Sequence, residues 1–226
     1  MTTQKDTAWG LAMIRECSDA ASLFSRGLHA TRAIRFDYDD AVVVMSLLAL
    51  GAEKMLKLTI GLAHRDRGER WPSTADMRRI GHRVREADRI ARPLLDRYAG
   101  TAPGFLDGVK FAVGNDRTVD EVLEALDRFG AAGRFYYLDL LAEDPQPGES
   151  PRMLWTSMTT AMALSDPALL ADINSTERAH EGRRRLNEEV ATALARWWDL
   201  YVAGWRTGVI GKEAQRYAGG IALPPI

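Results

Sequence analysis

The chain has 226 residues, and its 30 basic side chains nearly balance its 31 acidic ones, so its formal net charge of −1 gives no global attraction for nucleic acid. The 46% hydrophobic and 27% charged residues are typical of a soluble globular protein, and a single cysteine, Cys17, excludes an internal disulfide. The first residues lack a signal-peptide pattern, and Glu53, Lys54 and Lys57 interrupt the longest apolar run. We therefore expect a cytoplasmic protein with no membrane partner.

Apolar residues recur at three- and four-residue spacing over long stretches, whereas strict strand alternation is almost absent. This pattern predicts an all-α fold, an up-and-down helical bundle of long antiparallel helices. We expect helices at about 6–35, 38–65, 73–98, 104–113, 118–129, 133–142, 152–172 and 177–209. They are assigned to one domain, residues 1–210, followed by a partly disordered C-terminal tail, residues 211–226.

Several boundaries carry chemical signals. Pro72 followed by Ser73 or Thr74 predicts a capped helix start, and the run from Thr118 to Glu121 has a capping-box pattern. The strongest break is residues 143–151, with three prolines. We interpret it as a loop between two halves of one bundle, with a domain boundary as the alternative.

The second expected helix carries the most informative charge. Glu53 lies on a narrow polar sector of a helix that is otherwise apolar on most sides, so the helix should be central. Pairing with Lys57, four residues later, adds only about 0.2–0.5 kcal/mol. Because an unpaired charge is rarely buried, we expect Glu53 to enter an interior polar cluster with Arg79, His82 or Arg134. The alternative is that Glu53 lies at the rim of the bundle with its carboxylate in water.

Three short motifs resemble the HEPN (higher eukaryotes and prokaryotes nucleotide-binding) superfamily, which includes AbiV-like phage-resistance proteins. They are Gly51-Ala-Glu53-Lys-Met-Leu-Lys57, the polar loop at residues 64–70, and Ile80-Gly-His82-Arg-Val84. The later Gly133-Arg134-Phe-Tyr-Tyr137 is similar to an aromatic and arginine patch of some members. The resemblance covers residues 37–141. It implies an up-and-down bundle, frequent homodimers, and members that act as RNases in toxin–antitoxin or antiviral systems.

Ribonucleases of that superfamily carry an arginine that is followed, after four to six residues, by a histidine. None of the four histidines here has an arginine at that spacing. We therefore expect a HEPN-like homodimer that has lost catalysis and binds a nucleotide, RNA or a protein partner. The expected binding residues are Glu53, Lys57, Arg79, His82, Arg134 and Tyr137. The alternative is a metal-independent RNase that uses His82 with a nearby arginine such as Arg79, although a lone histidine at a helix start is more often structural.

Other motifs indicate neither a metal nor a cofactor. A di-iron bundle needs two Glu-x-x-His pairs, and the chain has one, Glu177 to His180. Arg178 and residues 183–185 are basic and could contact phosphates, but interleaved glutamates favour a solvated ion-pair face. Trp198, Tyr201 and Trp205 form a stripe that indicates either core or a dimer interface. A dimeric protein-interaction module built on that stripe is the third hypothesis.

Overall fold

The computed structural model describes residues 4–35, 37–96 and 104–224, and within them every regular element is helical. The three long helices are α1 (Gln4–Arg32), α2 (Asp37–Asp66) and α10 (Ala179–Arg206). The shorter α-helices are α3 (Thr74–Ile80), α4 (Val84–Ala91), α5 (Gly104–Gly114), α6 (Arg117–Ala131), α7 (Tyr136–Leu141), α8 (Pro151–Ser165), α9 (Pro167–Ile173) and α11 (Lys212–Ile221). Two 3₁₀ turns, η1 (Arg92–Asp96) and η2 (Gly133–Phe135), complete the set. The predicted all-α bundle is confirmed.

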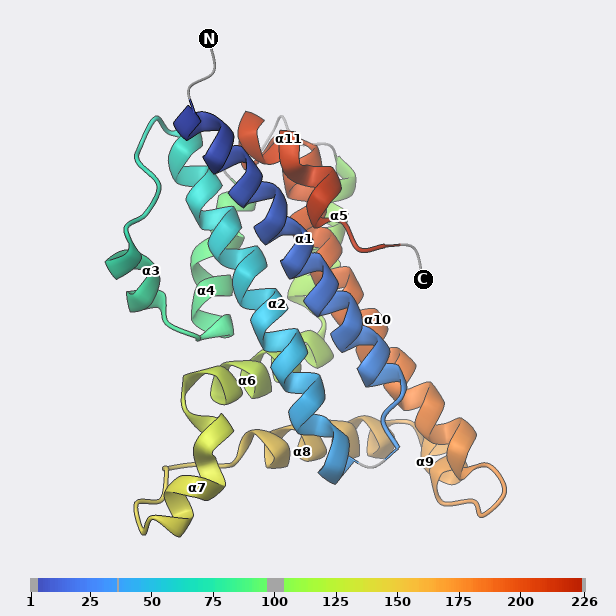
Figure 1. The fold of residues 1–226 in the computed structure, drawn as a ribbon. Helices are drawn as coiled ribbons and strands as arrows, with labels where there is room; N and C mark the ends of the chain where they lie inside the picture. Colours follow the sequence, from blue (N-terminus) through green and yellow to red (C-terminus); the bar gives the residue numbers. More distant parts are fainter. Residues whose placement is uncertain (1–3, 36, 97–103, 225–226) are drawn as a thin grey trace.

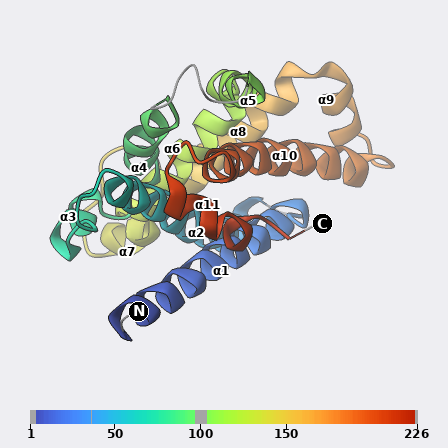
Figure 2. The same cartoon turned by 90° about the horizontal axis from the view of Figure 1, so that it is seen from above.

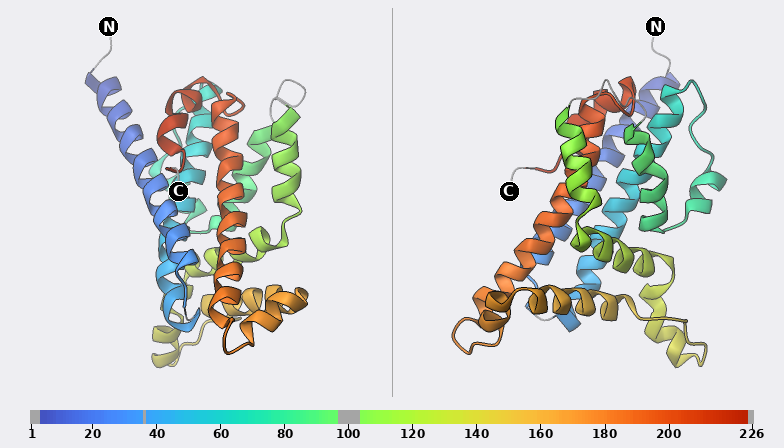
Figure 3. Two further views of the ribbon diagram at one scale, coloured as in Figure 1. Left: turned by 90° about the vertical axis from the view of Figure 1, so that its right-hand side faces the viewer. Right: turned by 180° about the vertical axis from the view of Figure 1, so that it is seen from behind.

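The long helices run side by side, with α1 antiparallel to α2 and to α10 (Figure 1). Seen from above, α2 lies between α1 and the shorter helices (Figure 2), which explains why so many of its side chains are buried. Helices α6 and α8 cross the lower end of the bundle rather than running along it, as both views in Figure 3 show. The bundle is therefore up-and-down only in its long helices.

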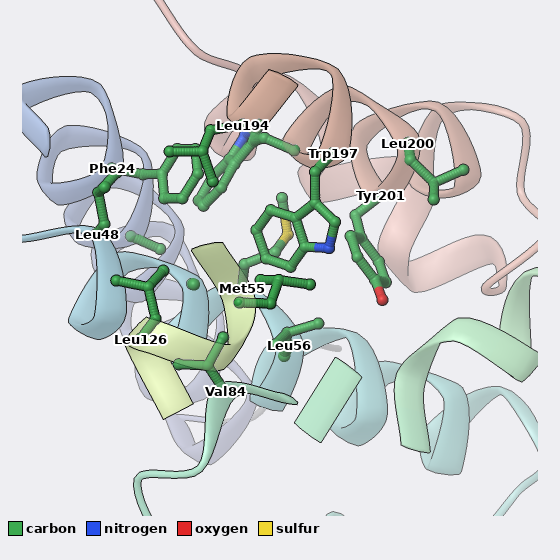
Figure 4. Packing of buried hydrophobic residues seen from close by; sticks show 14 of the residues in the cluster. Phe24, Leu48, Met55, Leu56, Val84, Leu126, Leu194, Trp197, Leu200 and Tyr201 are labelled. Atoms are coloured by element: carbon green, nitrogen blue, oxygen red, sulfur yellow. The ribbon is translucent and has the colours of Figure 1, made fainter. Parts of the chain in front are cut away.

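The core is built from aromatic side chains of α10 that pack on α1, α2 and α4. Trp197 and Tyr201 point toward Met55 and Leu56 of α2 (Figure 4). The Phe24 ring of α1 stacks on Trp198, with ring centroids 4.4 Å apart. Apolar burial of this kind stabilises a fold by about 25 cal/mol per Å² of apolar surface removed from water.

Small residues allow the close approach of α1 to α2. A Cβ atom on Gly51 would lie 2.8 Å from the backbone nitrogen of Phe24, and one on Gly27 would lie 2.6 Å from the Leu48 side chain. Both distances are shorter than real Cβ contacts. The two glycines therefore let the axes of α1 and α2 come close together.

Several predicted boundaries were wrong. The segment expected as one helix at 73–98 is divided into α3, α4 and η1, because Gly81 adopts φ +68° and ends α3; positions 97 and 98 lie outside the described residues. The segment at 152–172 is divided at Asp166, which is extended before Pro167. The segment at 133–142 begins as the η2 turn and becomes α7. Helix α6 is capped by Asp116 rather than by the expected Thr118 box, whereas Ser73 caps α3 as expected.

The expected disordered tail contains a helix. Residues 212–221 form α11, with Ala214, Ala218 and Ile221 buried. The indole N–H of Trp198 donates to the carbonyl oxygen of Ile221 at 2.9 Å. The prediction rested on glycine and proline content, which did not indicate that α11 packs against α1 and α10. Positions 225 and 226 lie outside the described residues.

Candidate functional site

The carboxylate of Glu53 is enclosed by two cationic or polar partners. Its Oε1 lies 2.7 Å from Nζ of Lys57, one turn further along α2, and its Oε2 lies 2.9 Å from Nδ1 of His82. The Glu53 side chain is only 12% exposed. The carboxylate is thus nearly buried and held by a residue 29 positions away in the sequence, and the interpretation that leaves it in open water does not describe this geometry.

The turn that carries His82, residues 81–83 between α3 and α4, is positioned by α6. We call it the His82 turn. Asp127 of α6 accepts hydrogen bonds from the backbone N–H of Arg85 at 2.9 Å and of Glu86 at 3.4 Å, so it caps the start of α4 from outside that helix. Asp127 also lies 3.3 Å from Nε of Arg83. A Cβ atom on Gly130 would lie 2.0 Å from the carbonyl oxygen of His82. The turn therefore rests directly on the backbone of α6.

The arrangement fixes the orientation of the imidazole ring. An ionised carboxylate only accepts hydrogen bonds, so the Nδ1 atom that faces Glu53 is the donor. In the neutral ring Nε2 is then an acceptor that points away from Glu53, and the His82 side chain is 55% exposed. Such a ring can accept a proton from, or donate one to, a ligand at the surface, and a carboxylate that orients a histidine is also the arrangement used in proton transfer.

The structure separates the other predicted site residues from this pair. Arg79 is 79% exposed and lies 3.4 Å from Asp76. Arg134 lies with its guanidinium carbon 5.1 Å from the centroid of the Phe135 ring. The Tyr137 hydroxyl is 3.5 Å from that of Ser150. Among the described residues, neither Arg79 nor Arg134 forms an ion pair or hydrogen bond with Glu53, so only His82 of the three expected partners contacts it.

The segment around His82 is locally basic although the chain is neutral. Residues 67–92 contain eight arginines and His82 against four carboxylates. Arg78, Arg79, His82 and Arg83 are all exposed within six consecutive positions. Arg78 forms no ion pair or hydrogen bond within the part of the chain that the structure describes. This turn is therefore an exposed cationic surface with one oriented imidazole.

Two carboxylates that position the candidate site were missed by the sequence reasoning. Asp127 holds the His82 turn, and Asp88 is a buried acceptor for Trp197 and Tyr201 of α10. Asp88 is also paired with Arg92, one turn later, at 2.8 Å. Its only signal in the sequence is this Asp-to-Arg spacing, which occurs on many exposed helices.

The basic stretch at the start of α10 is largely neutralised. Arg178 lies 3.2 Å from Asp172, and Arg185 pairs with Asp166 and Glu189. Residues Trp198, Tyr201 and Trp205 are completely buried within one chain. The interpretation of this stripe as a dimer interface is therefore wrong, because no part of it reaches the surface.

The described residues contain no group of three or more histidine, cysteine, aspartate or glutamate side chains suited to a metal ion. In the same residues, no helix is at once long enough and apolar enough to cross a membrane.

Comparisons with protein families, with curated protein sequences and with solved structures each gave no match. The resemblance to the HEPN superfamily therefore stays a prediction.

Proposed function

We propose that the protein is a HEPN-like helical protein of a prokaryotic defence or toxin–antitoxin type system, and that it binds single-stranded RNA at the His82 turn without cleaving it. The observation that carries the proposal is the 2.9 Å contact between Glu53 and His82 within an exposed cationic turn. Arginine side chains bind phosphates of any sequence, and an exposed imidazole adds a planar ring and a hydrogen-bonding nitrogen. The defence setting comes from the resemblance alone.

The test is binding of a fluorescein-labelled RNA oligonucleotide, measured by anisotropy at several salt concentrations. We expect the affinity of the wild type to fall as salt rises, with a slope of roughly 0.7 per neutralised phosphate on logarithmic axes. His82→Ala and Arg78→Ala should each weaken binding several-fold. Glu53→Gln should weaken it as well, because the amide holds the ring less firmly than a carboxylate does.

A matched control is Arg117→Ala. Arg117 is 81% exposed at the start of α6 and is paired with Glu121, so its removal changes the net charge by as much as Arg78→Ala does without touching the turn. If the wild type does not bind RNA, or if Arg117→Ala weakens binding as much as Arg78→Ala does, the proposal is wrong. Thermal unfolding of each variant shows whether a loss of affinity reflects a loss of fold.

A second candidate function is a metal-independent ribonuclease, and the exposed Nε2 side of His82 favours it. Incubation of end-labelled RNA with the protein in EDTA, followed by a denaturing gel, separates the two functions. Cleavage that His82→Ala abolishes would support the ribonuclease, with Arg78, Arg79 or Arg83 as the phosphate-binding partner. Bound but intact RNA would support binding alone.

A further inference from the structure

A second feature of the molecule is a cavity that the Glu53–His82 site does not use. It has a volume of about 570 Å³ and lies between the end of α2, the loop that follows it, α3 and α4. We call it the α3 cavity. Small-molecule sites in proteins have volumes of roughly 300–1,000 Å³, so this cavity is large enough for a ligand. Its apolar lining consists of Ile60, Trp71, Pro72, Ile80 and Ile90.

Helix α3 is not packed on a core of its own. None of its residues is buried, and Figures 1 and 3 show it standing apart from α2 and α4. Two isoleucines that line the cavity, Ile80 of α3 and Ile90 of α4, are each only partly covered. An apolar ligand in the cavity would therefore remove from water some apolar surface that the chain itself leaves uncovered.

Two sets of contacts hold the walls of the cavity in place. A Cβ atom on Gly61 would overlap Cη2 of Trp71, so the indole ring packs directly on the backbone of α2. The same ring meets that of Trp9 of α1 edge to face, with centroids 6.1 Å apart. Beyond Trp71, the backbone N–H of Ser73 donates to the Asp76 carboxylate at 3.1 Å and closes the capping box of α3. A cavity with fixed walls lowers the entropy lost when a ligand binds.

The charged side chains around the cavity leave one cation without a partner. Five titratable side chains line it, and four of them are compensated within the chain, in the pairs Arg79–Asp76, His64–Glu69 and Glu86–Arg89. The fifth, Arg70, forms no ion pair or hydrogen bond within the described residues. A cationic ligand would meet Arg70 as a like charge, whereas a single negative charge would complete the pairing. The cavity therefore matches an apolar molecule that carries one negative charge.

The residue types narrow the ligand further. Four of the five apolar lining residues are aliphatic, and the fifth, Trp71, already packs its ring against Gly61. Aromatic ligands gain most from the faces and edges of other rings, so this lining favours an alkyl chain. A carboxylate matches the planar fork of an arginine through two parallel hydrogen bonds, which makes it the head group that suits Arg70.

We propose that the α3 cavity binds a medium-chain aliphatic carboxylate, with its alkyl chain among Ile60, Ile80 and Ile90 and its carboxylate on Arg70. The alkyl chain supplies most of the affinity, because an exposed ion pair changes an affinity by no more than about fivefold. Arg70 selects the charge of the head group. The cavity is separate from the Glu53–His82 contact, and the proposal does not depend on RNA binding.

The first experiment titrates ligands that differ in head group or chain into the full chain by isothermal titration calorimetry. Sodium decanoate should bind as one molecule per protein, more tightly than decanol, and decanol more tightly than decylammonium. Octanoate should bind about 15-fold more weakly than decanoate, because each of the two missing methylene groups contributes about fourfold when buried. Naphthoate, an aromatic carboxylate, should also bind more weakly than decanoate.

Three variants test the assigned contacts. Arg70→Gln should weaken decanoate roughly fivefold and leave decanol unchanged. Ile90→Ser should weaken decanoate and decanol by the same factor, because it removes apolar wall and no charge. The matched charge control is Arg216→Gln, at an exposed position of α11 outside the cavity lining, which should leave both ligands unchanged. Thermal unfolding of each variant shows that it is folded before its affinity is interpreted.

Hydrogen exchange locates the ligand without any substitution. Decanoate should slow amide exchange in residues 70–80, because it covers the inner side of α3, and leave α5 and α6 unchanged. The proposal is overturned if the wild type binds no decanoate below the concentration at which decanoate forms micelles, or if residues 70–80 exchange at an unchanged rate. It is also overturned if decylammonium or naphthoate binds as tightly as decanoate, or if Arg70→Gln binds decanoate as the wild type does.

Discussion

The indole nitrogen of Trp197 lies 2.8 Å from Oδ1 of Asp88, which ties α10 to α4 across 109 positions of sequence. The same oxygen accepts from the Tyr201 hydroxyl at 2.7 Å. Complete burial raises the pKa of Tyr201 well above its ordinary value, and the negative charge of Asp88 raises it further. Because α4 also begins with the His82 turn, this pair contributes to the position of the candidate site.

Asp88→Ala should reduce the free energy of unfolding by about 3 kcal/mol, since it leaves two buried donors without an acceptor. Chemical denaturation followed by far-ultraviolet circular dichroism measures the change. Asp120→Ala is the matched control, because the Asp120 side chain is 63% exposed and, among the described residues, its ion pair is with Arg85 at the surface. Equal losses for the two variants would contradict the structural role assigned to Asp88.

Gly130→Ala should displace the His82 turn, because its Cβ atom would lie 2.0 Å from the His82 carbonyl oxygen. Overpacking of this kind costs about 1–3 kcal/mol. RNA affinity should fall together with stability, while the His82 ring remains present. Gly108→Ala is the matched control, because Gly108 lies on the exposed side of α5, where an added Cβ atom would meet nothing within 4 Å. That variant should be stabilised by up to about 1 kcal/mol. If Gly130→Ala were as stable as the wild type, the close contact between Gly130 and the His82 carbonyl oxygen would be contradicted.

Cys17 should not react with Ellman's reagent at pH 8 while the protein is folded. Burial, with a smaller contribution from the charge of nearby Glu16, raises the pKa of its thiol to about 12, so almost no thiolate forms at pH 8. In guanidinium chloride concentrated enough to unfold the protein, one thiol per chain should react rapidly. Fast reaction without denaturant would indicate that α1 is less covered than the structure describes.

Acid should weaken the junction between α8 and α9. The backbone N–H of Leu169 lowers the pKa of Asp166, and the charge of Arg185 lowers it further. A carboxyl group whose pKa is lower in the folded state stabilises the fold above its unfolded pKa, about 3.9 for aspartate, and loses that contribution as the pH falls through the folded value. Asp166→Ala should therefore be less stable than the wild type at pH 7, and the difference should shrink as the pH falls below about 3.9. A difference that is constant with pH would argue against the cap.

The sequence predicted α2 and its buried charge well, because both follow from a local pattern. An apolar helix that carries Glu53 requires a cationic or hydrogen-bonding partner, whatever the fold. The local sequence pattern could not show which of His82, Arg79 and Arg134 is that partner. That choice depends on the conformation of Gly81 and on the cap from Asp127, a residue 42 positions beyond the backbone N–H of Arg85 that it binds.

Helical periodicity also could not show what covers Trp198 and Trp205. A spacing of three and four residues shows that the side chains share one side of a helix, but not whether the same chain or another one covers that side. Here α1 and α2 cover it, and the indole N–H of Trp205 donates to Thr59 at 2.9 Å.

The contact between Trp198 and the Ile221 carbonyl has a consequence for biosynthesis. Because α11 supplies part of the cover over α1 and α10, a nascent chain cannot close this part of its core until residues 212–221 have left the ribosome. A chain that terminated early, at Gly211, would leave the indole of Trp198 without its acceptor and the thiol of Cys17 with less cover. Such a fragment would be a substrate for chaperones and proteases rather than a smaller version of the same protein.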